Sequence, residues 1–419
     1  MARKMKDSGI EWVGEIPEGW KISKVSYFYE VQLGKMLQPQ KKSETDTEEK
    51  YLCAANVGKN SLSLDTLKTM WFSQTEKHQF DLKEGDLLVV EGGDVASCAI
   101  IETPVRNLFF QNALHRVRPL HNESVAFLRY WLMTAKSYGY IDLICNKATI
   151  AHFSKEKFIA LPIPVIPQDI QSKIVSFLDL ECKQIDDLLS KSRSSIEEHK
   201  KLKQAVITQA VTKGVRGERE MKDSGVEWVG EINHRFSLIK LKYICSILDQ
   251  YRKPISADRR SQSGSVLYDY YGASGAIDKI DNYTIDDHVM LIGEDGANLR
   301  MRNLPLMYEV NGKAWINNHA HILKPTERVD FYYLFYALEE LDINPYITGS
   351  AQPKLSQEKL QNIWVPLPDL EEQQEIATYI RSKCAEIDKL ITKKEHLINE
   401  LESYKKSLIY EVVTGKREV

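Results

Sequence analysis

Residues 5–16 read MKDSGIEWVGEI and residues 221–232 read MKDSGVEWVGEI, so the same stretch occurs twice with one difference, Ile10 against Val226. The two copies lie 216 residues apart. A match of this length does not arise by chance, and a search for internal repeats comes before any other reading of a sequence. The chain therefore contains two related units, each of which begins with this head.

Further matches show that the repeat extends beyond its head. Residues 153–157 (FSKEK) correspond to 355–359 (LSQEK), and residues 185–188 (IDDL) correspond to 387–390 (IDKL), both at an offset of 202 residues. The regions between head and tail therefore differ in length by 14 residues, the difference between the offsets of 216 and 202. The two units share a frame whose middle has changed.

The two middles are only faintly alike. The apolar runs in 85–90 (GDLLVV) and 287–292 (DHVMLI) predict short β-strands, and 111–115 (QNALH) resembles 317–321 (NNHAH). The glycines at 92–93 and at 293 and 296 follow these strands and indicate structural turns. A constant frame with a variable middle is the pattern expected of a recognition protein with two different targets.

Two long segments follow prolines and contain neither proline nor glycine until Gly214 and Gly415, which predicts two long helices. A helix of about 40 residues is about 60 Å long. This length favours antiparallel pairing of the two helices, although packing of each helix on its own domain remains an alternative. Breaks in the seam at Ser192, His199, Lys203, Lys394 and Lys405 indicate that helices of partner proteins complete it. The apolar residues expected to pair, at spacings of three and four, are Leu178, Ile185, Leu189, Ile196, Val206, Ile380, Ile387, Ile391, Ile398, Leu401 and Leu408.

The composition excludes several classes of protein. With 56 Lys and Arg against 59 Asp and Glu, the net charge is −3, so any nucleic-acid binding must come from local patches. No apolar run reaches the roughly 20 residues of a membrane helix, no signal peptide is visible, and the six cysteines are scattered, which together favour the cytoplasm. We find no phosphate-binding loop and no Asn-Pro-Pro-Tyr motif, and His319 and His321 lack supporting metal ligands. We therefore expect no catalytic residue, metal site or cofactor in this chain.

The chain resembles the specificity subunit of a type I restriction-modification system. The likeness rests on the DSGxEWVGEIPxxW opening at 7–20, a variable domain, the LPIPVIP exit at 161–167, a long helix, and the repetition of this order. The second copy departs by reading NHRF at 233–236 where the first reads PEGW. The expected fold is α+β, with two α/β target recognition domains in a tandem pseudo-repeat, separated by two long antiparallel coiled-coil helices, with approximate two-fold symmetry. The expected parts are domain 1 (1–166), the central helix (167–213), a linker (214–220), domain 2 (221–368) and the C-terminal helix (369–419).

The resemblance implies a non-catalytic DNA-recognition subunit. Each domain would read one half of a bipartite, asymmetric double-stranded DNA site, and the paired helices would set the spacing and dock two modification subunits. Those subunits would methylate adenine with S-adenosylmethionine, and restriction subunits would translocate and cleave DNA with ATP and Mg²⁺. A protein-interaction scaffold whose duplicated domains bind protein ligands remains the alternative.

Reading a base sequence requires hydrogen bonds to base edges, chiefly from Arg or Lys to guanine and from Asn or Gln to adenine. The candidates in the first middle are Lys35, Gln38, Lys59, Asn60, Arg106, Gln111, Asn112, Lys147, Thr149 and His152. Those in the second are Tyr271, Ser274, Asn298, Arg300, Arg302, Asn317, Asn318, Gln352 and Lys354. Further cations in the middles are Lys41, Lys42, Arg252, Lys253, Arg259 and Arg260. The amide pairs at 111–112 and 317–318 could equally cap turns, and Arg300 and Arg302 would share a face if 298–302 is extended.

Overall fold

The structure is a computed structural model that describes residues 3–58, 61–145, 151–217, 219–227, 229–257, 260 and 266–419. The chain divides into two compact units. Unit 1 consists of residues 1–192 together with 396–419, and unit 2 consists of residues 193–395. Each unit therefore contains one globular part and a stretch of each long helix.

Unit 1 is built around two sheets. The head forms a hairpin of β1 (Met5–Asp7) and β2 (Glu15–Pro17), and β3 (Lys21–Lys24) pairs with β11 (Pro162–Val165) at the exit of the globular part. The main sheet is antiparallel, in the order β4 (Tyr29–Leu33), β10 (Leu114–Pro119), β7 (Leu87–Val90), β8 (Cys98–Ile100). The second sheet has the order β6 (Lys68–Phe72), β5 (Thr47–Leu52), β9 (Leu108–Phe110). The short helices are α1 (Gln74–Gln79), α2 (Val125–Ser137), α3 (Tyr140–Ile144) and α4 (Lys155–Ile159).

Unit 2 repeats this plan with one larger sheet. Its head is the hairpin of β12 (Met221–Asp223) and β13 (Glu231–Asn233), and β14 (Ser237–Lys240) pairs with β21 (Trp364–Leu367). The sheet has the order β15 (Cys245–Ile247), β20 (Ala320–Pro325), β18 (Ile285–Gly293), β19 (Met307–Ile316), β16 (Tyr268–Gly272), β17 (Gly275–Ile280). The short helices are α6 (Asn298–Met301), α7 (Phe331–Glu340) and α8 (Gln357–Gln361). The strands expected in 85–90 and 287–292 are confirmed as β7 and β18.

The number of sheets differs because one strand is continuous in unit 2 and broken in unit 1. In unit 2, β19 pairs with β18 antiparallel and continues until its end pairs with β16 in parallel. In unit 1 the same path is divided into β8 and β9, which pair separately with β7 and β5. The connection between them contains Pro104, which cannot donate to a ladder, and Asn107, which has a φ of 50°. These residues end one strand before the next begins.

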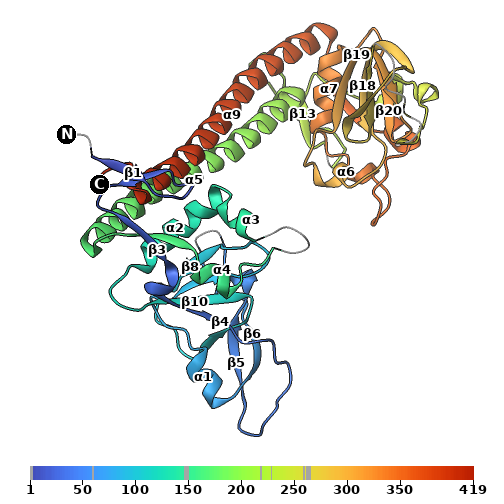
Figure 1. Cartoon of the computed structure of the whole chain (residues 1–419). Helices are drawn as coiled ribbons and strands as arrows, with labels where there is room; N and C mark the ends of the chain where they lie inside the picture. The colour runs from blue at the N-terminus through green and yellow to red at the C-terminus, as the bar shows by residue number, and fades with distance from the viewer. Residues whose placement is uncertain are drawn as a thin grey trace. The chain divides into compact units, whose positions relative to one another are not determined.

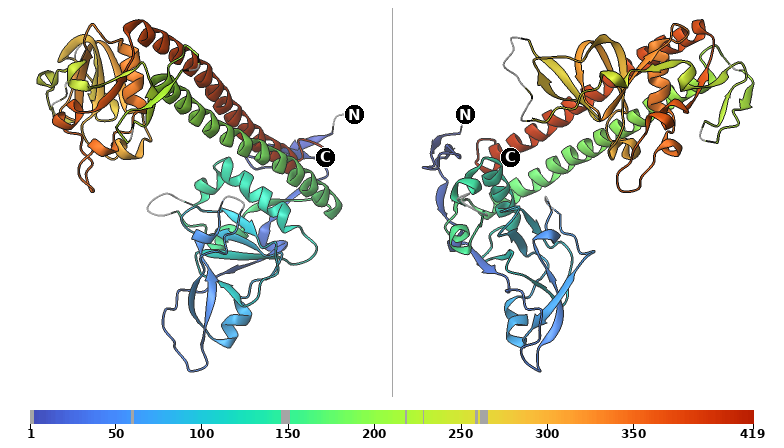
Figure 2. Two further views of the ribbon diagram at one scale, coloured as in Figure 1. Left: turned by 180° about the vertical axis from the view of Figure 1, so that it is seen from behind. Right: turned by 90° about the vertical axis from the view of Figure 1, so that its right-hand side faces the viewer.

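The two predicted long helices are α5 (Gln168–Lys213) and α9 (Leu370–Val413). In unit 1 the Nζ of Lys405 contacts both carboxylate oxygens of Asp186 at 2.6 and 2.7 Å, and in unit 2 the Nζ of Lys203 contacts both oxygens of Asp388 at 2.8 Å. The residue numbers of each pair have the same sum, 591, as an antiparallel alignment requires. The expected antiparallel pairing is confirmed, and the helices run side by side in each unit (Figures 1 and 2).

The helices also pack on the globular parts. In unit 1, Leu178 and Leu408 belong to the same core as Trp131 of α2, and in unit 2, Ile380 belongs to the same core as Tyr333 of α7. The periodicity left open whether each long helix pairs with the other or packs on its own domain, and the structure contains both kinds of contact. Among the residues expected to pair, the buried ones are Leu178, Ile185, Leu189, Ile196, Ile380, Ile387 and Leu408, and the half-buried ones are Val206, Ile391, Ile398 and Leu401.

A buried glutamine at the start of each helix shows that the duplicated frame keeps its hydrogen bonds. In unit 1, Gln171 accepts from the backbone N–H of Ser124 and donates to the carbonyl of Ile166, both at 3.0 Å. In unit 2, Gln373 accepts from the N–H of Asp330 and donates to the carbonyl of Pro368, both at 2.9 Å. Each glutamine thereby ties the N-terminus of its long helix to the N-terminus of α2 or α7. No helix in the described part of the chain is long and apolar enough to span a membrane.

Candidate nucleic-acid interface

Three segments meet at the same edge of the main sheet in both units, and we call this region the loop edge. In unit 1 it comprises residues 91–97, 111–113 and 151–154; in unit 2 it comprises 294–297, 317–319 and 348–355. The N–H of Glu91 donates to the carbonyl of Ala113 (2.9 Å), and the carbonyl of Glu91 accepts from Phe153 (2.8 Å). In unit 2, Glu294 makes the equivalent bonds, both 2.8 Å, with the backbone of 319 and 355. The frame thus brings together segments that are far apart in sequence.

In each unit a buried histidine forms a hydrogen bond with the third segment of the loop edge. The Nε2 of His115 bonds to the carbonyl oxygen of Phe153 at 2.7 Å, and the Nε2 of His321 bonds to that of Leu355 at 2.8 Å. Burial lowers the pKa of His115, so the neutral ring with its proton on Nε2 is the form that donates here. Its Nδ1 has no partner among the described residues, because Leu33 stands opposite it on β4.

The corresponding Nδ1 in unit 2 has an ionic partner. The Nδ1 of His321 lies 2.6 Å from a carboxylate oxygen of Asp249, whose other oxygen accepts from the N–H of Ile322 at 3.1 Å. Arg252 pairs with Asp249 at 3.1 Å and also with Glu294. The buried imidazole of unit 2 therefore joins a network of charges, whereas the buried imidazole of unit 1 is neutral and its Nδ1 has no partner among the described residues.

Glu294 lies at the centre of this network. Burial acts to raise the pKa of its carboxyl, but hydrogen bonds from Arg252 and Lys354 outweigh burial and hold that pKa below its usual value. Lys354, a predicted base reader, lies 3.0 Å from Glu294 with its side chain 55% exposed. His152 of unit 1 occupies the repeat-equivalent position and pairs with Glu91 at 3.1 Å. Both predicted readers are therefore tethered at the loop edge and remain accessible.

The predicted amide pairs differ in whether their side chains form hydrogen bonds within the described part of the chain. Asn317 is buried, and its side-chain oxygen accepts from the N–H of His319 at 2.7 Å, so it caps a turn. Gln111 and Asn112 are half-buried and Asn318 is exposed. The side chains of these three make no hydrogen bond within the described part of the chain, so their amides are available to a ligand.

Lys35 and Gln38, expected as base readers, are buried supports of the loop that spans residues 34–46. The Nζ of Lys35 contacts the carbonyl oxygen of the Gln38 side chain at 2.8 Å and the carboxylate of Glu76. Gln38 in turn donates to Asp46 at 3.3 Å. Burial acts to raise the pKa of Glu76, but hydrogen bonds from Lys35 and Ser73 outweigh it and lower that pKa. The loop borders a groove of about 500 Å³.

Residues 298–302 are not extended, so the shared face expected for Arg300 and Arg302 is not found. The side chain of Asn298 donates to the carbonyls of Leu304 and Pro305 at 3.2 and 3.1 Å and closes a turn around α6. Arg302 ends the helix with a φ of 51° and donates to the carbonyls of Glu339 and Leu341. Arg300 donates to the carbonyl of Gly349 at 3.3 Å. These side chains fasten the loop around α6 to its surroundings.

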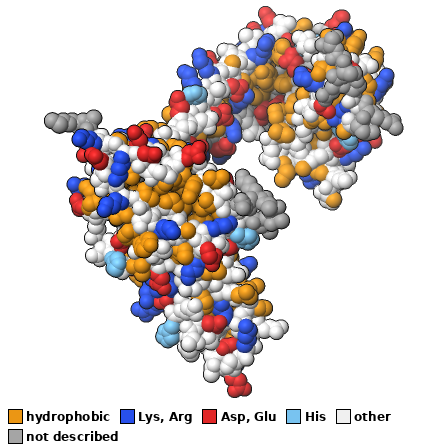
Figure 3. All heavy atoms as spheres, viewed as in Figure 1, with side chains coloured by type: hydrophobic (Ala, Val, Ile, Leu, Met, Phe, Trp, Pro, Cys, Tyr) orange, Lys and Arg blue, Asp and Glu red, His pale blue; other side chains and the backbone are white. Residues whose placement is uncertain are grey.

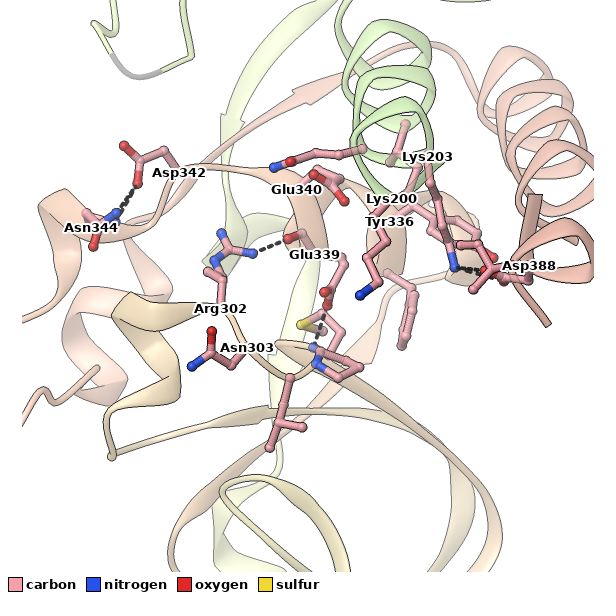
Figure 4. A pocket seen from close by; sticks show the side chains of 17 residues that line it. Lys200, Lys203, Arg302, Asn303, Tyr336, Glu339, Glu340, Asp342, Asn344 and Asp388 are labelled. Atoms are coloured by element: carbon pink, nitrogen blue, oxygen red, sulfur yellow. Dashed lines mark hydrogen bonds and ion pairs between the residues drawn. The ribbon is translucent and has the colours of Figure 1, made fainter. Parts of the chain in front are cut away.

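Arg302 also lines a pocket of about 870 Å³ in unit 2, between α5, α7, the middle of α9 and residues 302–307 (Figure 4). The carboxylate of Glu339 holds the last of these segments by accepting from the N–H groups of Leu306 and Met307 at 2.9 and 2.7 Å. Burial, with a further contribution from the charge of Glu339, raises the pKa of Glu340 to about 7. Apart from Arg302, no predicted base reader among the described residues lines this pocket.

The remaining predicted readers do not share one location, because Arg106 lies in the connection between β8 and β9, which starts at the end of β8 away from the loop edge. Arg106, Ser274 and Gln352 are exposed and Tyr271 is half-buried, with its carbonyl accepting from the N–H of Asn317 at 3.1 Å. Lys59, Asn60, Lys147, Thr149 and Arg259 lie outside the described residues. Basic and acidic side chains are interspersed on the visible face of both units (Figure 3). Within the described part of the chain, no group of three or more His, Cys, Asp or Glu is arranged to hold a metal ion.

The sequence interpretation named Arg252 only as a cation for DNA and missed the other residues that organise the loop edge: Glu91, Glu294, Asp249 and His115. A signal for part of this set was present, because His115 and His321 lie in the matched segments 111–115 and 317–321, and both glutamates follow the matched apolar strands. The partner Asp249 could not be found in this way because its counterpart in unit 1 is Leu33.

A family model for the type I restriction modification DNA specificity domain matches the chain twice, at residues 17–198 and 234–403. A putative type I restriction enzyme specificity subunit of Haemophilus influenzae is 31% identical over 168 residues, 40% of either chain. The MjaVIII specificity subunit of Methanocaldococcus jannaschii is 26% identical over 290 residues, 64% of either chain. The chain thus spans less than two thirds of the length of both relatives.

Two solved structures show that the fold is shared along nearly the whole chain. A chain from work on complex assembly and conformational transition of the type I R-M system superposes with a TM-score of 0.73 at 12% identity, covering 95% of this chain and 98% of that one. The HsdS subunit of Thermoanaerobacter tengcongensis superposes with a TM-score of 0.53 at 14% identity, covering 96% and 98%.

Proposed function

Because the chain belongs to the family of type I restriction-modification DNA specificity domains, we propose that it is a specificity subunit whose two units each read one half of a bipartite, asymmetric DNA site. One observation carries this proposal. The same loop edge is built twice on equivalent backbone hydrogen bonds, and its accessible side chains differ between the copies. A constant support with different contact residues is what two different half-sites require.

The accessible side chains suit base reading. Gln111 and Asn112 in unit 1, and Asn318 and Gln352 in unit 2, offer amides that can pair with adenine edges. Lys354 at the loop edge, and Arg106 in the connection between β8 and β9, supply cations for guanine or phosphate. With a net charge of −3 the isolated chain neutralises few phosphates. Tight binding therefore depends on partner subunits that enclose the duplex.

We assign spacing and docking to the paired helices. Leu188 and Leu390 occupy equivalent positions in the repeat, as do Leu202 and Tyr404, and all four are about half exposed on α5 and α9. Repeated apolar side chains of this kind suit a partner that binds in two copies, which we propose to be the modification subunits. Adenine methylation with S-adenosylmethionine, and cleavage with ATP and Mg²⁺ by restriction subunits, would then belong to those partners.

An exchange of one middle tests this function. Replacing residues 20–150 by those of a relative in the assembled methylating complex should change one half of the methylated site and leave the other intact, as read from methylated adenines in the host genome. A change in both halves, or in neither, would contradict the modular reading. The scaffold alternative predicts that the complex shows no preference for any bipartite duplex over scrambled DNA.

Substitutions at the loop edge test the same function at single bases. Gln111→Ala with Asn112→Ala should weaken binding to the first half-site by about 5- to 150-fold, since a bidentate contact contributes about 1–3 kcal/mol of discrimination. Asn318→Ala with Gln352→Ala should act on the second half-site alone. Asn282→Ala, at an exposed position outside the loop edge, serves as the control.

A further inference from the structure

Two adjacent apolar side chains protrude from unit 1 next to the loop edge. Met36 is 75% exposed and Leu37 is 50% exposed. They occupy consecutive positions in the loop that spans residues 34–46, and the residues on either side of them, Lys35 and Gln38, are buried. Exposure of two adjacent apolar side chains at one tip costs solvation free energy, which burial against a ligand would recover.

The tip is held rigidly on both sides. Lys35 donates its N–H to the carbonyl of Phe110 at 3.0 Å, and its own carbonyl accepts from Asn112 at 2.9 Å. The carbonyl of Gln38 accepts from the N–H of Trp71 at 3.1 Å. The side chains of Lys35 and Gln38 are fixed by the chain of contacts from Glu76 to Asp46. Met36 and Leu37 therefore stay exposed, because their neighbours anchor the loop and prevent it from folding back onto the protein.

The tip adjoins the residues proposed to contact DNA. Lys35 forms a β-bridge with Gln111, so Met36 directly follows a residue that touches the loop edge. Gly34 permits this approach, because a Cβ at that position would overlap the carbonyl oxygen of Gln111. On the other side lie Lys41 and Lys42, both exposed. The apolar tip and these two lysines line one groove, and the bridge from Lys35 places Gln111 next to the start of the tip.

We propose that Met36 and Leu37 form an apolar wedge that enters the first half-site and unstacks one base step. Proteins that bend DNA insert Met or Leu in this way between base pairs, at a cost of a few kcal/mol per step. Here the cations would hold the adjacent phosphates while the amides read neighbouring bases. The inference rests on the proposed function, since it takes DNA as the ligand of unit 1.

At the positions that directly follow Lys253, the described part of unit 2 has no equivalent wedge. Lys253 corresponds to Lys35, because its N–H donates to the carbonyl of Ile316 at 2.9 Å as that of Lys35 does to Phe110. The next two residues are Pro254 and Ile255, and Ile255 is half-buried with its carbonyl accepting from the hydroxyl of Tyr270 at 3.4 Å. The distortion should therefore be confined to the half-site that unit 1 reads.

Fluorescence of 2-aminopurine tests the wedge, because this base brightens when it is unstacked. It is placed in turn at each position of the first half-site other than the methylated adenine, in a duplex bound by the assembled complex. The native complex should raise the fluorescence at one base step. Met36→Ser with Leu37→Ser should abolish that rise and weaken binding roughly tenfold or more, through the loss of two buried apolar side chains.

Leu120→Ser is the matched control. Leu120 is also 50% exposed, and it follows the far end of β10, where its N–H bonds to Phe28. The control should leave both fluorescence and affinity unchanged. Specific binding without a fluorescence rise, or a rise that survives the double substitution, overturns the wedge and leaves the proposed function standing. Loss of a partner subunit from the double variant would show a protein contact in its place, and absence of any site-specific binding by the native complex overturns both proposals.

Discussion

The two loop edges are supported by the same backbone hydrogen bonds but by different side chains. In unit 1 a neutral His115 lies opposite Leu33, whereas in unit 2 His321 lies against Asp249 and a network that includes Arg252 and Glu294. What both units keep is the imidazole that bonds to the third segment. Both units thus keep one buried polar side chain that hydrogen-bonds to the third segment of the loop edge, whereas the charged residues around this side chain differ between the units.

The contacts between the globular parts and their own helices differ in a similar way. In unit 1 the hydroxyl of Tyr130 donates to Asp179 at 2.6 Å. The residue equivalent to Asp179 in unit 2 is Arg381, whose guanidinium lies 4.1 Å from the ring centre of Tyr332, and the hydroxyl of Tyr332 donates to Glu309 at 2.9 Å. The helix residue has exchanged its charge, and its aromatic partner stands at another position, since Tyr130 is the sixth residue of α2 and Tyr332 is the second residue of α7. Each globular part therefore matches its own stretch of helix.

The largest effect is expected from removing the ionic partner that only unit 2 has. Asp249→Ala leaves the buried Nδ1 of His321 and the N–H of Ile322 without an acceptor. We expect a loss of about 3 kcal/mol in the free energy of unfolding of unit 2. Hydrogen exchange read by mass spectrometry reports the two units separately. Asp286→Ala, at an exposed position of β18, should cost less than about 0.5 kcal/mol, and an equal cost for both would refute the role of Asp249.

The second largest effect is a difference in stability loss between substitutions of the equivalent lysines Lys35 and Lys253. Lys35→Ala removes a buried cation from Glu76 and Gln38 and should destabilise unit 1 by about 2 kcal/mol, less than a fully buried pair because Glu76 is partly exposed. Lys253→Ala, at the exposed counterpart in unit 2, should stay within about 0.5 kcal/mol. Urea unfolding of both variants measures the loss in the free energy of unfolding. Comparable losses would mean that Lys35 does not support the loop that spans residues 34–46.

The two units should respond to pH in opposite directions. Burial lowers the pKa of His115, so unit 1 loses stability as the pH falls below the unfolded pKa of about 6.5. Burial and the charge of Glu339 raise the pKa of Glu340 to about 7. Unit 2 therefore loses stability as the pH rises from about 4.5, the ordinary value, to about 7.

One proton contributes at most about 1.4 kcal/mol per pH unit to either slope. Hydrogen exchange in each unit between pH 5 and 7.5 measures both slopes. His115→Gln should flatten the slope of unit 1 alone, and Glu340→Gln that of unit 2 alone. Parallel slopes in the native chain would contradict both assignments.

The smallest effect concerns the feature that the two units share. Lys405→Ala and Lys203→Ala each remove an exposed ion pair between α5 and α9 and should cost about 0.5 kcal/mol, with a loss that shrinks at high salt. A double-mutant cycle of each lysine with its aspartate measures the pair directly. Lys383→Ala, which breaks a pair within α9, is the control. If the coupling energy between the helices is no larger than that of the pair within α9, the ion pairs do not set the register of the two helices and the apolar residues do.

The sequence predicted the shared frame because the helices and strands of the frame are determined by patterns of neighbouring residues. The repeat, the long helices and the strands β7 and β18 follow from matched segments and from spacings of apolar residues that neighbours along the chain decide. The roles of loop side chains depend on distant residues. Lys35 looks like a surface lysine until Glu76 is placed beside it, and Asn298 looks like a base reader until the turn to Pro305 closes on it. A sequence without these partners cannot distinguish a support from a contact.

The division of the chain into a continuous and a discontinuous unit has a consequence for synthesis on the ribosome. Unit 2 is formed by residues 193–395 alone, whereas unit 1 needs residues 396–419, including Leu408 and Val412 in its core and Tyr410, whose hydroxyl bonds to the head at Val13. The nascent chain therefore contains every residue of unit 2 before it contains every residue of unit 1. Unit 1 begins to be synthesised first but is completed last. The apolar surface of α5 that packs against α9 is exposed until α9 has been synthesised.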